Sequence, residues 1–203
     1  MYCSCCSAYA CRGRFGCRCA VRLQGASAWA VPELDKAVQY GFITDRIKDN
    51  MPGNITREEF AEVAVRLYEL YTGKKAVAGT TKFSDTNNVE IFKAANLGMV
   101  SGIGGGKYGP KLLVTREQMA AVMYRTLKVL NPSADFSAGT VKLADDSRIT
   151  SYFKESVYYC SKNGIIKGST DSNGNSVFNP KGNSTREQAV IVCVRGTRLI
   201  IKN

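Results

Sequence analysis

Apolar residues recur along this chain with a helical period, and the same apolar stripe occurs in three segments. Seven residues before Gly41, Gly98 and Gly164 the chain has Leu34, Ile91 and Val157, and four residues before them it has Ala37, Ala94 and Cys160. This spacing places both positions on one helix face. Each glycine is followed by a hydrophobic residue, as in a left-handed helix C-cap. The pattern predicts three short helices that end at these glycines.

A second set of three helices is predicted by a repeated tetrapeptide. Thr-Arg-Glu followed by Glu or Gln occurs at 56–59, 115–118 and 185–188. A Thr followed three residues later by Glu or Gln is the capping-box signature of a helix N-terminus. Apolar residues with helical spacing follow each box; they are Phe60, Val63, Ala64, Leu67 and Tyr68, then Met119, Val122, Met123 and Leu127, then Ala189, Val192 and Cys193.

The arginine of each tetrapeptide has no role in capping. A cation in the first turn lies at the unfavourable end of the helix dipole, at a cost of about 0.3–1 kcal/mol. Arg57, Arg116 and Arg186 repeat this arrangement three times. We therefore expect these side chains to point toward an anionic group, which free helix N–H groups could also bind. The alternative is a solvated arginine paired with the neighbouring glutamate.

The two helix sets define three copies of one helix-loop-helix unit. We expect copies at residues 26–75, 80–131 and 141–203, separated by polar linkers. Short helices are marginal alone, so neighbouring copies must bury one another. The prediction is an all-α protein. The pattern by itself leaves open whether the copies form an open solenoid or close around a pseudo-threefold axis.

The first 25 residues differ from the repeats. They hold six cysteines (Cys3, Cys5, Cys6, Cys11, Cys17 and Cys19) and several arginines. The spacing fits no pair of CxxC motifs and no apolar signal-peptide core, so it favours neither a zinc site nor an evident export signal. We expect a disordered tail or an artefact of the chosen start, with the true start of the reading frame upstream.

Composition narrows the function. The chain has no His, which excludes histidine acid-base catalysis and most zinc sites. No apolar run is long enough to span a membrane. The net charge is +11, and subtracting the four arginines of the first 24 residues still leaves +7 for the rest. This charge favours an anionic partner such as nucleic acid, an acidic polysaccharide or a membrane surface.

Taken together, these motifs resemble the S-layer homology (SLH) module. The family pattern is an apolar-x-Asp lead-in, a Gly-x-x-x-Gly loop, an aromatic-x-Pro turn and the Thr-Arg box. The second copy shows it as Asp85, Gly98, Gly102, Tyr108-Gly109-Pro110 and Thr115-Arg116, and the third as Asp145, Gly164, Gly168, Phe178-Asn179-Pro180 and Thr185-Arg186. The first copy is weaker, because it has Asp45 for the second glycine and lacks the lead-in Asp.

The resemblance implies three helical repeats in a pseudo-threefold arrangement that anchor a bacterial surface protein. The implied ligand is an anionic secondary cell-wall polymer on peptidoglycan, often bearing pyruvate ketals, and the implied location is the extracellular cell surface. No cofactor and no metal are expected. The implied ligand-binding residues are Arg57, Arg116, Arg186, Gly102, Gly168, Asp85, Asp145, Trp29 and Tyr152. The two aromatic residues could equally belong to the core.

Other functions fit the sequence less well. A glycosidase needs two separated carboxylates, and Asp145-Asp146 or Glu58-Glu59 already have structural explanations. Cys160 and Cys193 lie at apolar helix positions without a histidine to activate them. The basic residues form no stripe and no groove-reading motif, so we expect no nucleic-acid partner. A calcium loop at 171–175 has its glycine at the wrong position. The alternative to an anchor is a fragment of a polysaccharide-active enzyme or a protein-interaction module.

Overall fold

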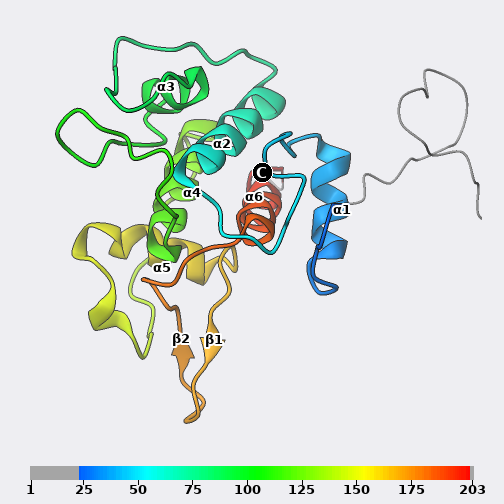
Figure 1. Cartoon of the computed structure of the whole chain (residues 1–203). Coiled ribbons are helices and arrows are strands. Elements are labelled where there is room, and N and C mark those ends of the chain that lie inside the picture. Colours follow the sequence, from blue (N-terminus) through cyan, green and yellow to red (C-terminus); the bar gives the residue numbers. More distant parts are fainter. Residues whose placement is uncertain (1–22, 202–203) are drawn as a thin grey trace, which may run out of the picture.

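The computed structural model describes residues 23–201 (Figure 1). Within this range it contains six α-helices, two short 3-10 helices and two short strands. The α-helices are α1 (Val31–Tyr40), α2 (Arg57–Thr72), α3 (Val89–Asn96), α4 (Arg116–Leu130), α5 (Lys154–Lys162) and α6 (Arg186–Ile201). The 3-10 helices are η1 (Asp146–Arg148) and η2 (Ser151–Phe153), and the strands are β1 (Ser169–Thr170) and β2 (Ser176–Val177).

The prediction of an all-α protein is wrong. Strands β1 and β2 pair as an antiparallel hairpin, with Ser169 opposite Val177 and Thr170 opposite Ser176. This hairpin projects away from the helices in Figure 1. Further isolated bridges join the loops, and long irregular segments separate the helices. The reason is that residues 165–184 form a long loop, and an extended loop satisfies its backbone N–H and C=O groups by pairing with itself.

The helix boundaries follow the predicted capping residues. Thr56 and Thr115 form complete capping boxes with Glu59 and Gln118. Thr185 does the same with Gln188, since each donates a backbone N–H to the other's side-chain oxygen. The predicted C-cap glycines all have left-handed backbones, with φ of 78° at Gly41, 71° at Gly98 and 64° at Gly164.

Each first helix packs against the second helix of the preceding copy. Helix α3 of the second copy contacts α2 of the first, α5 of the third contacts α4 of the second, and α1 of the first contacts α6 of the third. Helices α2, α4 and α6 also contact one another. Figure 1 shows α1 beside α6, although the two helices lie at opposite ends of the described chain. The three copies therefore close on one another instead of forming an open row.

A ring of backbone hydrogen bonds joins the three copies just before the second helices. The N–H of Ile55 donates to the carbonyl of Ser184, Ser184 donates to Val114, and Val114 donates to Ile55, at 2.9, 2.9 and 3.1 Å. The side chains of Ile55 and Val114 are buried at this ring, as is Ser184. Because each copy is both a donor and an acceptor, the ring is complete only when all three are present.

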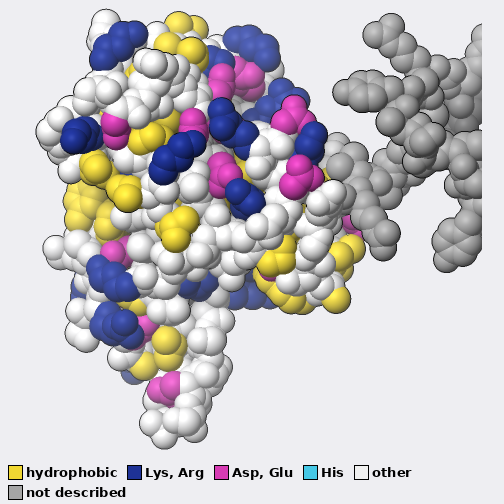
Figure 2. Space-filling model, viewed as in Figure 1, with side chains coloured by type: hydrophobic (Ala, Val, Ile, Leu, Met, Phe, Trp, Pro, Cys, Tyr) yellow, Lys and Arg dark blue, Asp and Glu magenta, His cyan; other side chains and the backbone are white. Residues whose placement is uncertain are grey.

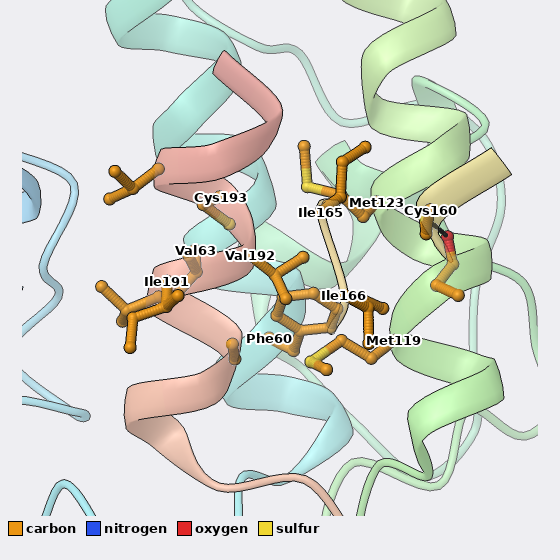
Figure 3. Packing of buried hydrophobic residues seen from close by; sticks show 14 of the residues in the cluster. Phe60, Val63, Met119, Met123, Cys160, Ile165, Ile166, Ile191, Val192 and Cys193 are labelled. Carbon is orange, nitrogen blue, oxygen red and sulfur yellow. Dashed lines mark hydrogen bonds between the residues drawn. The ribbon is translucent and has the colours of Figure 1, made fainter. Parts of the chain in front are cut away.

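The main hydrophobic core lies between α2, α4 and α6 and extends to α1 and α5. Figure 3 shows Phe60 and Val63 of α2, Met119 and Met123 of α4, and Val192 and Cys193 of α6 facing the same interior. Ile165 and Ile166, which follow α5, also point into it. A smaller cluster between α2 and α3 holds Ile91, Ala94 and Met99.

The third residue of each box is a buried glutamate that joins neighbouring copies. Glu117 accepts hydrogen bonds from the backbone N–H and hydroxyl of Thr150, and Glu187 accepts the same pair from Ser27. Glu58 accepts a hydrogen bond from the Asn88 side chain. Glu117 and Glu187 thus cap the segments that lead into the first helices, and all three carboxylates lie near the positive end of their own helix dipoles.

Two further expectations from the sequence concern the N-terminal tail and membrane-spanning helices. The predicted N-terminal tail, 1–25, falls outside the described residues except for 23–25. Among the described residues, the structure has no helix with the length and hydrophobicity to cross a membrane.

Candidate ligand-binding groove

The box arginines lie at the junctions between copies. Arg57 of the first copy donates from Nε to the carbonyl of Tyr108 (2.9 Å) and from Nη2 to that of Ser101 (2.7 Å), both in the second copy. Its guanidinium also lies over the Tyr108 ring, 4.6 Å from the centroid. We call this contact junction 1. The guanidinium is thus held by neutral acceptors and an aromatic face, both of which leave its positive charge uncancelled.

Junction 2 repeats this geometry one copy later. Arg116 donates from Nε to the carbonyl of Phe178 (2.7 Å) and from Nη2 to that of Lys167 (2.9 Å). It lies over the Phe178 ring, 5.2 Å from the centroid. Burial lowers the pKa of Arg116, against the attraction of Asp145, which raises it. The Arg116 guanidinium nevertheless stays charged, as arginine does in proteins.

Junction 3 departs from the pattern. Arg186 forms an ion pair of 2.6 Å with Glu59, the last residue of the first box. Its Nη1 makes two longer hydrogen bonds, of 3.3 Å, to the carbonyls of Asp49 and Asn50. Its Nε is buried without a hydrogen-bond partner. This arginine is paired with a glutamate, but the pair differs from the solvated arginine beside its neighbouring glutamate that the sequence offered as the alternative: the partner belongs to another copy's box and the Arg186 side chain is 19% exposed.

Backbone hydrogen bonds show that the loop before the first box is shifted by one residue relative to the sequence pattern. The N–H groups of Glu58 and Glu117 donate to the carbonyls of Pro110 and Pro180, but Glu187 donates to Met51, not Pro52. Asp49 therefore occupies the place of Tyr108 and Phe178. The first copy has no aromatic ring at that place, so Arg186 lacks the ring contact of the other two arginines.

The lead-in aspartates support the aromatic turns of their own copies. Asp85 accepts the backbone N–H groups of Tyr108 and Gly109, each at 2.8 Å. Asp145 accepts those of Phe178 and Asn179, at 2.9 and 2.7 Å. The hydrogen bond from Tyr108, helped by that from Gly109, lowers the pKa of Asp85 against the opposing effect of burial. Both carboxylates thus hold the carbonyl groups that bind Arg57 and Arg116.

The loop glycines are required by close backbone packing. A Cβ at Gly168 would lie 2.3 Å from the carbonyl oxygen of Val177, and one at Gly102 would lie 2.7 Å from that of Lys107. No side chain fits at such distances, so both positions need glycine. The residue before each of them, Ser101 or Lys167, supplies a carbonyl to the box arginine.

Junction 1 opens into a cavity of about 350 Å³, which we call groove 1. It brings together three predicted site residues, one from each copy: Arg57, Gly102 and Tyr152. Its apolar lining includes Val100 and Val122. Groove 1 is therefore a site to which all three copies contribute.

Arg125 of α4 lines groove 1 as well, and sequence analysis missed it. Its Nη2 donates to the Tyr152 hydroxyl (2.7 Å), and its guanidinium lies 5.6 Å from that ring's centroid. A signal was present in the sequence, because an arginine follows each box arginine by nine residues, at Arg66, Arg125 and Arg195. Nine residues are two and a half helix turns, so this second arginine lies on the opposite side of the helix from the box arginine. The sequence alone gives no reason to distinguish it from an ordinary solvent-exposed residue.

The two predicted aromatic contacts are surface residues and not part of the core. Tyr152 is 69% exposed and Trp29 is 56% exposed. Tyr152 lies in groove 1 beside Arg125, whereas Trp29 precedes α1. An exposed ring beside a cation can stack on the apolar face of a ligand.

Arg195, the counterpart of Arg125, is engaged by an acidic residue. It contacts Glu33 of α1 through Nε and Nη2, with a shortest distance of 2.6 Å, and Arg198 also reaches Glu33 at 3.1 Å. Burial alone would raise the pKa of Glu33, but the hydrogen bond and charge of Arg195, with the charges of Arg198 and Lys167, lower it overall. This pair joins the first and third copies.

We expect this contact to make the fold sensitive to acid. Because the folded-state pKa of Glu33 is lowered, its stabilisation is present above the unfolded pKa, about 4.3, and is lost as the pH falls through the folded value. The urea midpoint should therefore decrease between about pH 5 and pH 3. In a Glu33→Gln variant the midpoint at pH 7 should be lower and its decrease with acid smaller. An unchanged decrease would show that other carboxylates control it.

The candidate catalytic groups considered from the sequence have structural roles. Cys160 and Cys193 are buried, and burial raises the pKa of both thiols, that of Cys193 to about 12. Among the residues that the structure describes, no group of three or more Asp, Glu, Cys or His side chains could bind a metal ion. The 171–175 segment forms a turn in which Asp171 accepts hydrogen bonds from Asn173 and Asn175.

Basic and acidic side chains are mixed on one face of the molecule. On the face drawn in Figure 2, Lys and Arg side chains alternate with Asp and Glu instead of forming a stripe. This distribution differs from the continuous basic surface typical of nucleic-acid-binding proteins.

Comparison with known proteins identifies the repeats. The family model of the S-layer homology domain matches residues 82–120 and 142–190. These two matches contain the second and third Thr-Arg-Glu boxes, together with Asp85, Gly102, Asp145 and Gly168. The first copy lies outside them, and its place in the ring comes from the structure.

Three bacterial enzymes are similar in sequence. An amylopullulanase of Thermoanaerobacterium thermosulfurigenes is 30% identical over 142 residues, which are 68% of this chain and 7% of the enzyme. The exoglucanase XynX of Acetivibrio thermocellus is 32% identical over 111 residues, 51% of this chain and 10% of the enzyme. An endoglucanase of Bacillus sp. (strain KSM-635) is 28% identical over 171 residues, which are 82% of this chain and 17% of the enzyme.

The chain spans less than a fifth of the length of each of these relatives. The similarity therefore concerns a segment that the three enzymes share with this chain. The family match covers the second and third copies, which supply residues to junctions 1 and 2. The chain contains S-layer homology domains at residues 82–120 and 142–190.

Proposed function

We propose that this protein is a non-catalytic anchor that binds an anionic cell-wall polysaccharide in groove 1. S-layer homology domains bind polymers of the bacterial cell wall, which is the general role supported by the family match. The proposed place of action is the outer surface of the cell. The observation that carries the proposal is the meeting of Arg57, Arg125 and Tyr152 in one cavity.

The chemistry of groove 1 suits an acidic sugar. Arginine binds a carboxylate with two parallel N–H donors and keeps its charge at all physiological pH values. Arg57 is held in place by two carbonyl groups, so little side-chain entropy remains to be lost when a ligand binds. Tyr152 offers an exposed ring for a sugar face, and Val100 and Val122 supply an apolar wall.

The proposed ligand is a secondary wall polymer that carries carboxylates, such as pyruvate ketals on hexose units. A pyruvate ketal combines a carboxylate with a methyl group on a rigid ring. Such a unit could place its carboxylate at the arginines while its methyl and ring carbons contact the apolar wall. The similarity to polysaccharide-degrading enzymes is consistent with an anchor that keeps another protein at the wall.

The proposal is tested by co-sedimentation with wall sacculi before and after the secondary polymer is chemically stripped. The protein should sediment with intact sacculi and stay in solution with stripped ones. DNA mixed with the protein at moderate salt should show no change in electrophoretic mobility. Equal sedimentation with both kinds of sacculi would contradict the proposal, as would release of sugars from the wall by the purified chain.

We expect Arg125→Ala to weaken binding while leaving the fold intact. A charge-assisted hydrogen bond contributes about 1.5–3 kcal/mol, so the dissociation constant should rise about 10- to 150-fold. The contact of Arg125 to Tyr152 is an exposed hydrogen bond, and its loss should cost little stability. Binding is measured by titrating sacculi and quantifying the free protein.

The matched control is Lys74→Ala, which removes one positive charge from an exposed position after α2. It changes the net charge equally but should bind as the parent does. If both variants lose affinity to the same degree, binding depends on overall charge and not on groove 1.

A further inference from the structure

We propose that Glu59 blocks the third anion-binding position of this protein by neutralising Arg186. This inference rests on the proposed function, because it asks which junctions accept the anionic ligand. The second and third boxes end in Gln118 and Gln188, whereas the first ends in Glu59. The last residue of the box is thus a carboxylate in the first copy and a neutral amide in the other two.

The cyclic arrangement of the copies assigns each of these residues to one arginine. Glu59, in the first turn of α2, contacts Arg186, the first residue of α6. One step around the ring, Gln118 near the start of α4 lines the same cavity as Arg57. The last residue of the first box thus pairs with the arginine of the preceding box in the cycle, and the last residue of the second box shares a cavity with the corresponding arginine. We infer that the charge of this residue determines whether the arginine is already paired.

The Arg186–Glu59 contact is sheltered from solvent. The Arg186 side chain is 19% exposed and that of Glu59 is 11% exposed. Exposed ion pairs contribute little because water and salt screen them, but screening is weaker for partly buried charges. An anionic ligand at Arg186 would have to displace Glu59 or lie beside its negative charge, so both routes are unfavourable.

The orientation of Arg186 supports the same conclusion. The Nε groups of Arg57 and Arg116 both donate to a carbonyl of the next copy. The Nε of Arg186 is buried without such an acceptor. An unsatisfied buried donor is costly, so an opposing attraction must maintain it. The short contact to Glu59 provides that attraction.

The reciprocal substitutions keep the helix caps. Glu59 uses one carboxylate oxygen to accept the N–H of Thr56 and the other to bind Arg186. A Gln can accept the same N–H, as Gln118 does from Thr115 and Gln188 from Thr185. Glu59→Gln and Gln118→Glu should therefore both fold, and each changes the charge beside one arginine.

The test follows the Nε–H signals of arginines by NMR while the full chain is titrated with a methyl hexoside that carries a 4,6-pyruvate ketal. Arginine-to-lysine variants assign the signals. In the parent, the Arg57 signal should shift and that of Arg186 should not. In Glu59→Gln the Arg186 signal should also shift. In Gln118→Glu the affinity measured at Arg57 should fall about tenfold or more.

The outcomes separate this inference from the proposed function. If the Arg57 signal of the parent does not respond, the proposed function fails. Two results would overturn the role of Glu59 but keep ligand binding in groove 1, provided that the Arg57 signal shifts. One is a shift of the Arg186 signal in the parent. The other is no shift of the Arg186 signal in Glu59→Gln. An unchanged affinity in Gln118→Glu would likewise overturn it.

Discussion

Deletion of the third copy, residues 141–203, should unfold the rest of the protein. In an open solenoid each repeat contacts only its neighbours, so a terminal repeat can be lost while the others stay folded. Here α1 packs against α6 and α4 packs against α5, so both remaining copies would lose a helix partner. The hydrogen-bond ring would also lose its donor and acceptor at Ser184.

The measurement is the cooperativity of urea unfolding, followed by near-ultraviolet circular dichroism and by amide dispersion in NMR. The truncated chain should show no cooperative transition. As a matched control, a protease site placed at Gly139–Thr140 and then cut should leave a folded complex. That position is exposed, and Gly139 has no neighbour within 4 Å of an added Cβ. A truncated chain with a sharp transition would contradict the closed arrangement.

Phe178→Ala should be the most destabilising single substitution that we consider. The Phe178 side chain is fully buried in the main core and also lies beneath the Arg116 guanidinium. Removing a buried phenylalanine ring costs about 3–5 kcal/mol, from lost transfer energy and the cavity left behind. This is a large part of the 5–15 kcal/mol that typically stabilises a domain. The urea midpoint should fall while the slope stays unchanged.

Tyr152→Ala is the control for this substitution. It also removes one aromatic ring, but the Tyr152 ring is 69% exposed. Its free energy of unfolding should stay within about 0.5 kcal/mol of the parent, while binding to wall sacculi weakens. If Phe178→Ala were as mild as Tyr152→Ala, the turn before the third box would not be part of the core.

Local sequence signals predicted most helix boundaries because the groups that end a helix lie near it in sequence. The Thr56 box and the Gly41 C-cap depend on residues within four positions. The apolar stripe was equally informative, since Leu34, Ile91 and Val157 are all buried. The short hairpin of β1 and β2 was missed, because two-residue strands have too few positions for an alternating pattern.

Contacts between copies could not be predicted in the same way. The sequence indicates that Arg57 and Arg186 are equivalent, but their partners lie 44 to 137 residues away. In the first copy Met51, not Pro52, takes the place of Pro110 and Pro180, so Asp49 takes the place of the aromatic residue. The sequence suggested otherwise, because Pro52 is only one residue away from the expected proline position. The difference between Gln and Glu at the end of the box also looked neutral, since either residue completes a cap.

Groove 1 takes Arg57 from one repeat, Gly102 from a second and Tyr152 from a third. An engineer who wishes to graft this groove onto another scaffold must therefore transplant the whole ring, since no single repeat forms it. The same dependence couples the three repeats: a substitution in one repeat alters a surface to which the other two also contribute.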